Sequence, residues 1–167
     1  MNTTNKQLYE AIFHRKSIRK YDMTPLPELT IADLKKFAGE VTPLDKNIKY
    51  EFSFLSTNDV KNPLALNAPH YICLYSENKD NYLMNAGFIL QQIDLYLSAN
   101  DIGSCWYGVA KPSKYITEFK NGLEFVIMLG FGKSNEPLHR KDASEFNRKN
   151  MSSIILNLHL FEFINYK

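Results

Sequence analysis

The spacing of apolar residues predicts three helices along the chain. From about Thr3 to His14, apolar residues recur on one helical face, with capping residues before them and no internal glycine or proline. A second, shorter helix is predicted from a capping box at Thr30 and Asp33 as far as Gly39. The segment Asn81–Ala99 is apolar around most of its circumference, which is typical of a helix at the centre of a bundle or at a dimer interface.

Strand patterns lie between and after these helices. Polar and aromatic residues alternate in Tyr50–Ser56, which predicts a strand. Two further strands are predicted at Tyr71–Ser76 and at the strongly apolar Phe125–Gly130. Near the end, Ile154–Leu160 alternates in a way that favours a strand, although it could also begin a helix. Asn100–Gly103 supplies turn chemistry after the long helix, and the following segment around Cys105 is also interpreted as part of a turn. Helices and strands together indicate an α+β fold.

Composition limits the size and class of the protein. The chain has 167 residues, 44% of them hydrophobic, which predicts one domain spanning residues 1–167. The 20 Lys and Arg are interspersed with 18 Asp and Glu, so no concentrated basic face for nucleic acid is expected. Without a signal peptide or a membrane-length apolar run, we expect a cytoplasmic protein. Its two cysteines have no zinc-site spacing, so no metal is expected and reduced thiols are favoured.

A basic cluster near the amino terminus is the first candidate for chemistry. Arg15, Lys16, Ser17 and Arg19 combine three cations with a hydroxyl within five positions. Guanidinium groups form bidentate charge-assisted bonds with phosphate, and the serine hydroxyl adds a further donor. The alternative is a solvated basic helix end, favoured by the helix dipole.

Several motifs in order resemble the FMN-dependent nitroreductase family. They are RKSIRKYD near the amino terminus, APHYICLYS (68–76), NAGFILQQIDLYLSANDIGSCWYG (85–108), FVIMLGFGK (125–133) and EPLHRK (136–141). The resemblance implies a mixed or antiparallel sheet flanked by helices, with the long central helix at a dimer interface. It also implies a homodimer that holds FMN in a groove to which both subunits contribute.

The resemblance assigns roles to individual residues. Arg15, Lys16 and Ser17 would hold the phosphate and ribityl chain, and Arg19 would approach the flavin pyrimidine and stabilise the reduced ring. The full set implied as cofactor-binding is Arg15, Lys16, Ser17, Arg19, Cys105, Trp106, Tyr107, Gly108, Arg140 and Lys141.

Alternatives stay open for several of these positions. Trp106 and Tyr107 would be ring neighbours of the flavin or ordinary packing aromatics. Arg140 and Lys141 would close over the phosphate. His139 is interpreted as a surface imidazole rather than a phosphate donor.

The implied activity is reduction of nitro compounds, quinones or related small acceptors with electrons from NAD(P)H, in a ping-pong sequence. No catalytic side chain is assigned, because the flavin carries the chemistry. Residues 22–67 lack the asparagine-containing string that contacts flavin in most members, and residues 150–167 form an atypical tail. We therefore expect a shortened member of a subgroup with two fused halves. The alternative function is a flavin-binding or structural protein without significant turnover.

Overall fold

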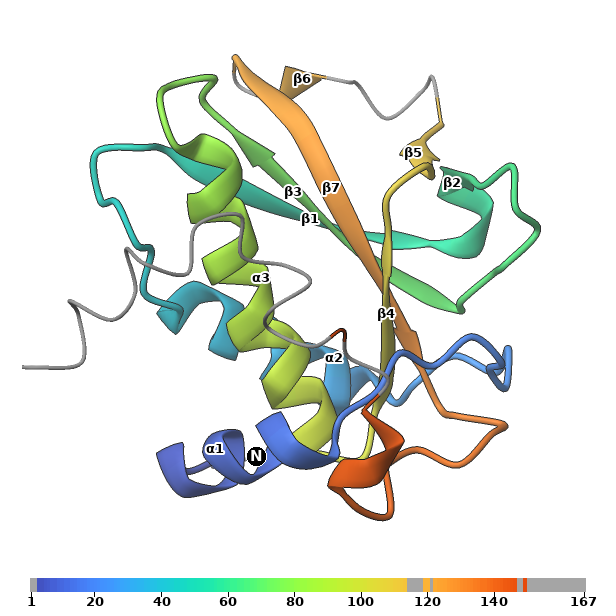
Figure 1. Ribbon diagram of the computed structural model, residues 1–167. Coiled ribbons are helices and arrows are strands. Elements are labelled where there is room, and N and C mark those ends of the chain that lie inside the picture. Colours follow the sequence, from blue (N-terminus) through green and yellow to red (C-terminus); the bar gives the residue numbers. More distant parts are fainter. Residues whose placement is uncertain (1–2, 114–118, 121, 147–148, 150–167) are drawn as a thin grey trace, which may run out of the picture.

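Three helices lie together beside a twisted sheet (Figure 1). The protein is described from a computed structural model, in which residues 3–113, 119–120, 122–146 and 149 are described. The helices are α1 (Asn5–His14), α2 (Glu28–Glu40) and α3 (Tyr82–Ala99), with short 3-10 helices η1 (Thr57–Asp59) and η2 (Ala143–Glu145). The predicted strand within residues 154–160 and the tail 150–167 lie outside the described residues.

The first helix begins where the capping residues predict, and the second does not. Thr4 and Gln7 form a reciprocal capping box at the start of α1. The predicted capping box at Thr30 is wrong, because α2 begins two residues earlier, at Glu28, directly after Pro27. Proline fixes its own φ and favours an extended residue before it, so it defines this boundary without a side-chain cap.

The main sheet is antiparallel throughout its paired strands. Its order is β1-β3-β7-β4, with β6 also paired to β7. The strands are β1 (Tyr50–Ser56), β3 (His70–Ser76), β4 (Gly103–Tyr107), β6 (Phe119–Lys120) and β7 (Leu123–Gly132). A separate pair joins β2 (Val60–Lys61) to β5 (Lys111–Pro112). The three strands predicted from the pattern are therefore confirmed as β1, β3 and β7.

The segment after α3 is a strand, and its interpretation as a turn was wrong. β4 pairs with β7 in a register that places Cys105 opposite Gly130 and Trp106 opposite Leu129. The chain reverses earlier, at Asp101, whose φ of 58° lies in the left-handed region. Aspartate tolerates that conformation better than most residues. The turn is therefore complete before Gly103.

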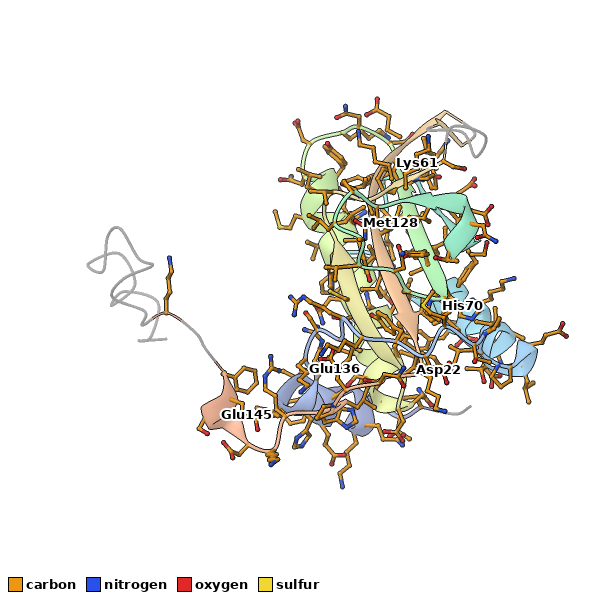
Figure 2. All side chains as sticks on the ribbon, turned by 90° about the vertical axis from the view of Figure 1, so that its right-hand side faces the viewer. Asp22, Lys61, His70, Met128, Glu136 and Glu145 are labelled. Carbon is orange, nitrogen blue, oxygen red and sulfur yellow. The ribbon has the colours of Figure 1, made fainter. Side chains whose placement is uncertain are left out.

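Alternate residues of the strands serve two separate apolar clusters. On one face, Ile72 and Leu74 of β3 pack with Leu129 of β7 and with α2 and α3. On the other face, Tyr71 and Cys73 belong to a cluster that also contains Cys105, Tyr107 and Met128. Figure 2 shows Met128 in the middle of the sheet. This separation follows from the two-residue period of a strand. Within the described residues, no helix is long and apolar enough to cross a membrane.

Gly130 is required by the close approach of β4 to β7. A Cβ at this position would lie 2.4 Å from Cε2 of Tyr107 and 3.0 Å from Cβ of Ala68. We predict that Gly130→Ala lowers the free energy of unfolding by about 1–3 kcal/mol through overpacking, measured by urea denaturation. The control is Gly39→Ala in α2, where a Cβ meets nothing within 4 Å and helix propensity improves. Equal stability of the two variants would contradict this packing.

Candidate functional site

The basic cluster lies in an extended segment beside β4, residues 15–22, which we call the outer strand; isolated bridges rather than a regular ladder join it to its neighbours. Arg15 caps α1 at its carboxyl end with extended backbone angles (φ −62°, ψ 142°). Ser17 pairs in parallel with Ser104, and the backbone N–H of Ile18 donates to the Ser104 carbonyl at 2.8 Å. The alternative of a solvated helix end therefore does not apply to Lys16, Ser17 and Arg19, which lie beyond the helix.

A second segment, residues 133–140, lies along the same outer strand. The backbone N–H of Asp22 donates to the carbonyl of Lys133 at 2.9 Å. The backbone N–H of Asn135 donates to the carbonyl of Lys20, also at 2.9 Å. At the other end, the N–H of Arg140 donates to the carbonyl of His14 at 2.8 Å. The outer strand is thus held by backbone bonds to two neighbours, and Arg140 is brought beside Arg15.

Glu136 binds the backbone of the basic cluster directly. The N–H groups of Arg19 and Lys20 donate to its Oε1 at 2.5 and 3.1 Å. The hydrogen bond from Arg19 is the main cause that lowers the pKa of Glu136, and the bond from Lys20 and the nearby lysine charges add to it. Figure 2 shows Glu136 near the same end of the molecule as Asp22, away from Lys61. Glu136 therefore fixes the middle of the outer strand.

The outer strand and β4 meet around the thiol of Cys105. Burial raises the pKa of this thiol, while the charge of Arg19 and a hydrogen bond with Ser17 oppose the rise; Asp94 and Arg15 also lie within electrostatic reach. A thiol with a raised pKa is a poor nucleophile at neutral pH. Cys105 therefore marks a place where Ser17, Arg19 and β4 come together.

A buried carboxylate, Asp94 of α3, connects these elements. Its side chain is fully buried, and Nε of Arg15 lies 3.0 Å from Oδ2. The indole N–H of Trp106 donates to Oδ2 at 3.1 Å, and the hydroxyl of Ser104 donates to Oδ1 at 2.5 Å. The Arg15 contact is an ion pair without good hydrogen-bond alignment, since its buried Nε has no hydrogen-bond partner. The sequence analysis missed Asp94, although it is the one charged residue of an apolar helix.

A cavity is lined by both Arg15 and Arg140. Its volume is about 320 Å³, and its walls come from Ile12, Arg15, Gln91, Leu95, Arg140 and Phe146. The Cζ atom of Arg140 lies 4.2 Å from the centroid of the Phe146 ring, a cation–π geometry. Two guanidinium groups and an amide thus border a space large enough for a phosphate group.

A family model described as "Putative TM nitroreductase" matches residues 7–160 of the chain. The chain belongs to this nitroreductase family. No curated protein matches it.

Solved structures of nitroreductases share the fold. A nitroreductase family protein from Clostridium difficile aligns at a TM-score of 0.66 and 14% identity, over 93% of this chain and 97% of that one. A nitroreductase with bound FMN from Bacteroides fragilis aligns at a TM-score of 0.63 and 14% identity, over 89% of this chain and 99% of that one. A protein described as a putative NADH oxidase from Clostridium acetobutylicum aligns at a TM-score of 0.63 and 18% identity, over 90% of this chain and 98% of that one. At these identities the likeness shows the fold, and the α+β expectation is confirmed.

The nitroreductase fold brings together most of the residues that the sequence singled out. Arg15 and Arg140 share a cavity, and Ser17 and Arg19 lie near Cys105. Gly108 follows β4 in an exposed position. Lys141 is exposed, and its backbone N–H donates to Glu145 at 3.3 Å, outside the cavity lining.

The aromatic and imidazole residues have structural partners of their own. Tyr107 is buried, and its ring meets that of Tyr71 edge to face at 5.5 Å, as ordinary packing predicts. Trp106 is half-buried against the α3 side of the sheet. His139 is not a surface imidazole, because it is half-buried and its Nε2 lies 3.2 Å from the carbonyl of Ser98. Among the described residues, no three His, Cys, Asp or Glu side chains are grouped for a metal.

The role of Glu136 predicts a pH-dependent contribution to stability. Because the folded-state pKa is lowered, the contribution is present above the ordinary glutamate pKa of 4.5 and is lost as the pH falls through the folded value. We expect Glu136→Gln to reduce the free energy of unfolding by up to about 1 kcal/mol at pH 7, with a smaller difference in Tm from the wild type below pH 4.5.

The matched control is Glu10→Gln, which removes only an exposed pair with Lys6 at 3.9 Å. Thermal unfolding of the three proteins across pH provides the measurement. A Glu136 effect that persists unchanged in acid would show that the carboxylate charge is not its cause.

Proposed function

We propose that the protein is an FMN-dependent oxidoreductase that uses NAD(P)H to reduce nitro compounds, quinones or related small acceptors. The observation that carries the proposal is the outer strand: it joins Arg15, Ser17 and Arg19 to the Cys105–Gly108 segment in a nitroreductase-family fold. Relatives of this fold include structures described with bound FMN and as an NADH oxidase. Together these features support a flavin site at this edge of the sheet.

The donor set fits the phosphate of FMN. A dianionic phosphate is best held by guanidinium groups and hydroxyls. Arg15 and Arg140, which both line the cavity, supply the guanidinium groups, and Ser17 supplies a hydroxyl two positions after Arg15 in the chain. Lys16 adds a further cation on the same strand. We therefore propose these four residues as the phosphate and ribityl ligands.

Arg19 is proposed as the cation that faces the flavin ring. Its side chain is exposed, and its charge reaches Cys105 and Tyr107 at the outer end of β4. Bound FMN would supply the redox chemistry, taking a hydride from NAD(P)H and passing electrons to the acceptor in a ping-pong sequence. A fixed positive charge beside the ring would stabilise negative charge that develops on reduction. The backbone of Trp106, Tyr107 and Gly108 would border the ring, since the side chains of Trp106 and Tyr107 lie on opposite faces of the sheet. Cys105 would be a further neighbour.

The experiment compares two neighbouring cations on the outer strand. We expect Arg19→Gln to lower kcat/KM for NADH by about tenfold or more, because one stabilising charge is lost in the transition state. The control is Lys20→Gln, since both residues are exposed and both bind Glu136 through backbone N–H groups that the substitutions keep.

Stopped-flow bleaching of the flavin by NADH and by NADPH measures this step in each variant. Equal rates for Arg19→Gln and Lys20→Gln would remove Arg19 from the site. Bound flavin that neither nicotinamide reduces in the wild type would contradict the oxidoreductase and support a flavin-binding protein without turnover.

We also propose that the protein is a homodimer that pairs through α1 and α3. Large apolar side chains are exposed along both helices, which pack against each other: Tyr9, Ile12 and Phe13 on α1, and Leu83, Met84 and Phe88 on α3. Exposed apolar surface of this extent is typical of an interface. A second copy would cover it by symmetry.

This proposal predicts that Phe88→Glu shifts the protein toward monomer. A charge at a position now 45% exposed costs little in the isolated chain but is unfavourable in an apolar interface. The control is Leu29→Glu on α2, at 74% exposure. Analytical ultracentrifugation should show a dimer for the wild type and the control, with the dimer dissociation constant raised at least about tenfold for Phe88→Glu. A monomeric wild type, or an unaffected variant, would contradict this interface.

A further inference from the structure

Asp94 occupies a position where a charge is unfavourable unless it has partners. It is fully buried and is the only charged side chain within α3, between Ile93 and Leu95. Burying a carboxylate carries a large desolvation cost, and such groups are found with ion-pair and hydrogen-bond partners. The partners of Asp94 therefore indicate why the residue is there.

Those partners come from two elements of the candidate site. Arg15 belongs to the outer strand, and Ser104 and Trp106 belong to β4. Gln91 adds a weaker contact from α3 itself, with Nε2 3.4 Å from Oδ2. Ser104, Trp106 and Gln91 donate and Arg15 contributes a charge, so the arrangement suits an ionised carboxylate.

The orientation of Arg15 is the informative feature. Its Nε atom lies 3.0 Å from Oδ2 of Asp94 in an ion pair, while its side chain remains 20% exposed and lines the same cavity as Arg140. A guanidinium group is planar and rigid, so fixing Nε also fixes the two terminal amino groups, which carry four further N–H donors. Arg15 can therefore contact the carboxylate with one edge and an anion with another.

We propose that Asp94 is a positioning residue that holds Arg15 by Nε so that its terminal amino groups bind the phosphate of the cofactor. The inference rests on the proposed flavin function and names the residue that gives the site its preference for a phosphorylated flavin. Toward the phosphate, Asp94 would act through Arg15, while its bonds from Ser104 and Trp106 hold the carboxylate in place. It should therefore affect affinity for FMN and leave affinity for riboflavin, which lacks the phosphate, nearly unchanged.

The test titrates the full chain, freed of flavin, with FMN and with riboflavin, and follows flavin fluorescence. For Asp94→Asn we expect FMN to bind about tenfold or more weakly, the scale on which losing an outer carboxylate partner acts. Riboflavin affinity should stay within about twofold. The control is Asp101→Asn, the same substitution at an exposed residue whose left-handed backbone suits asparagine.

A purely structural role predicts a different pattern. If Asp94→Asn weakens both flavins equally, or strengthens FMN binding, the positioning role is overturned. In an Arg15→Ala background, Asp94→Asn should cause no further loss of FMN preference, and a further loss would show that Asp94 acts independently of Arg15.

Arg15→Lys provides a second variant in case Asp94→Asn does not fold. Lysine keeps the charge opposite Asp94 but has one nitrogen, which cannot serve the carboxylate and the phosphate from two edges. The preference for FMN should fall about tenfold, and a full preference would overturn the proposal. If the wild type binds FMN no more tightly than riboflavin, the phosphate site of the proposed function is contradicted. If the wild type prefers FMN and Asp94→Asn keeps that preference, only the positioning role of Asp94 is contradicted.

Trp106 gives a spectroscopic check, because it is the sole tryptophan and its indole donates to Asp94. We expect the emission maximum to shift in Asp94→Asn and to remain at the wild-type position in Asp101→Asn. An unchanged emission maximum in a folded Asp94→Asn variant would contradict the connection between Asp94 and Trp106.

Discussion

The backbone pairing of the basic segment with β4 is the constraint on which the candidate site depends. The bond from the Ile18 N–H to the Ser104 carbonyl places cations of the amino terminus beside residues nearly ninety positions later. Gly103 permits this approach, because a Cβ there would lie 2.9 Å from Cγ2 of Ile18. Any larger residue would collide with the side chain of Ile18, which would have to shift. The chemistry of this edge therefore depends on backbone geometry before it depends on charge.

Charges are then distributed on both sides of that strand. Asp94 forms an ion pair with Arg15 from within the core. The carboxylate of Glu136 accepts hydrogen bonds from backbone N–H groups, and this contact does not neutralise the side chain of Arg19. The two carboxylates thus hold the strand without neutralising every cation on it. This arrangement suits a site that must bind a phosphate at one end and stabilise developing negative charge at the other.

Local pattern predicted the regular elements, and tertiary contacts determined the rest. The capping box at Thr4 and the apolar period of α3 define those helices within their own sequence. β4 was misinterpreted because it begins at Gly103, which has weak strand propensity, directly after turn residues, and the strand forms through pairing with β7. The start of α2 at Glu28 followed proline geometry rather than the apparent cap at Thr30.

The same distinction holds for the candidate site. The composition of RKSIRK indicated anion binding, but it could not show that the residues after Arg15 are extended and bridge to β4. Asp94 was hidden because one acidic residue in an apolar helix gives no motif; its partners lie on segments that only the fold brings together. His139 was misjudged for the same reason, since its contact with Ser98 spans forty-one positions.

The most direct test of a flavin site at this edge of the sheet is the visible absorption spectrum of the purified protein, recorded before and after incubation with FMN and passage through a desalting column. The account predicts a retained flavin spectrum, with its band shape altered from that of free FMN by the protein environment. A colourless protein after reconstitution would contradict the flavin site and leave the chain as a member of the family by fold alone.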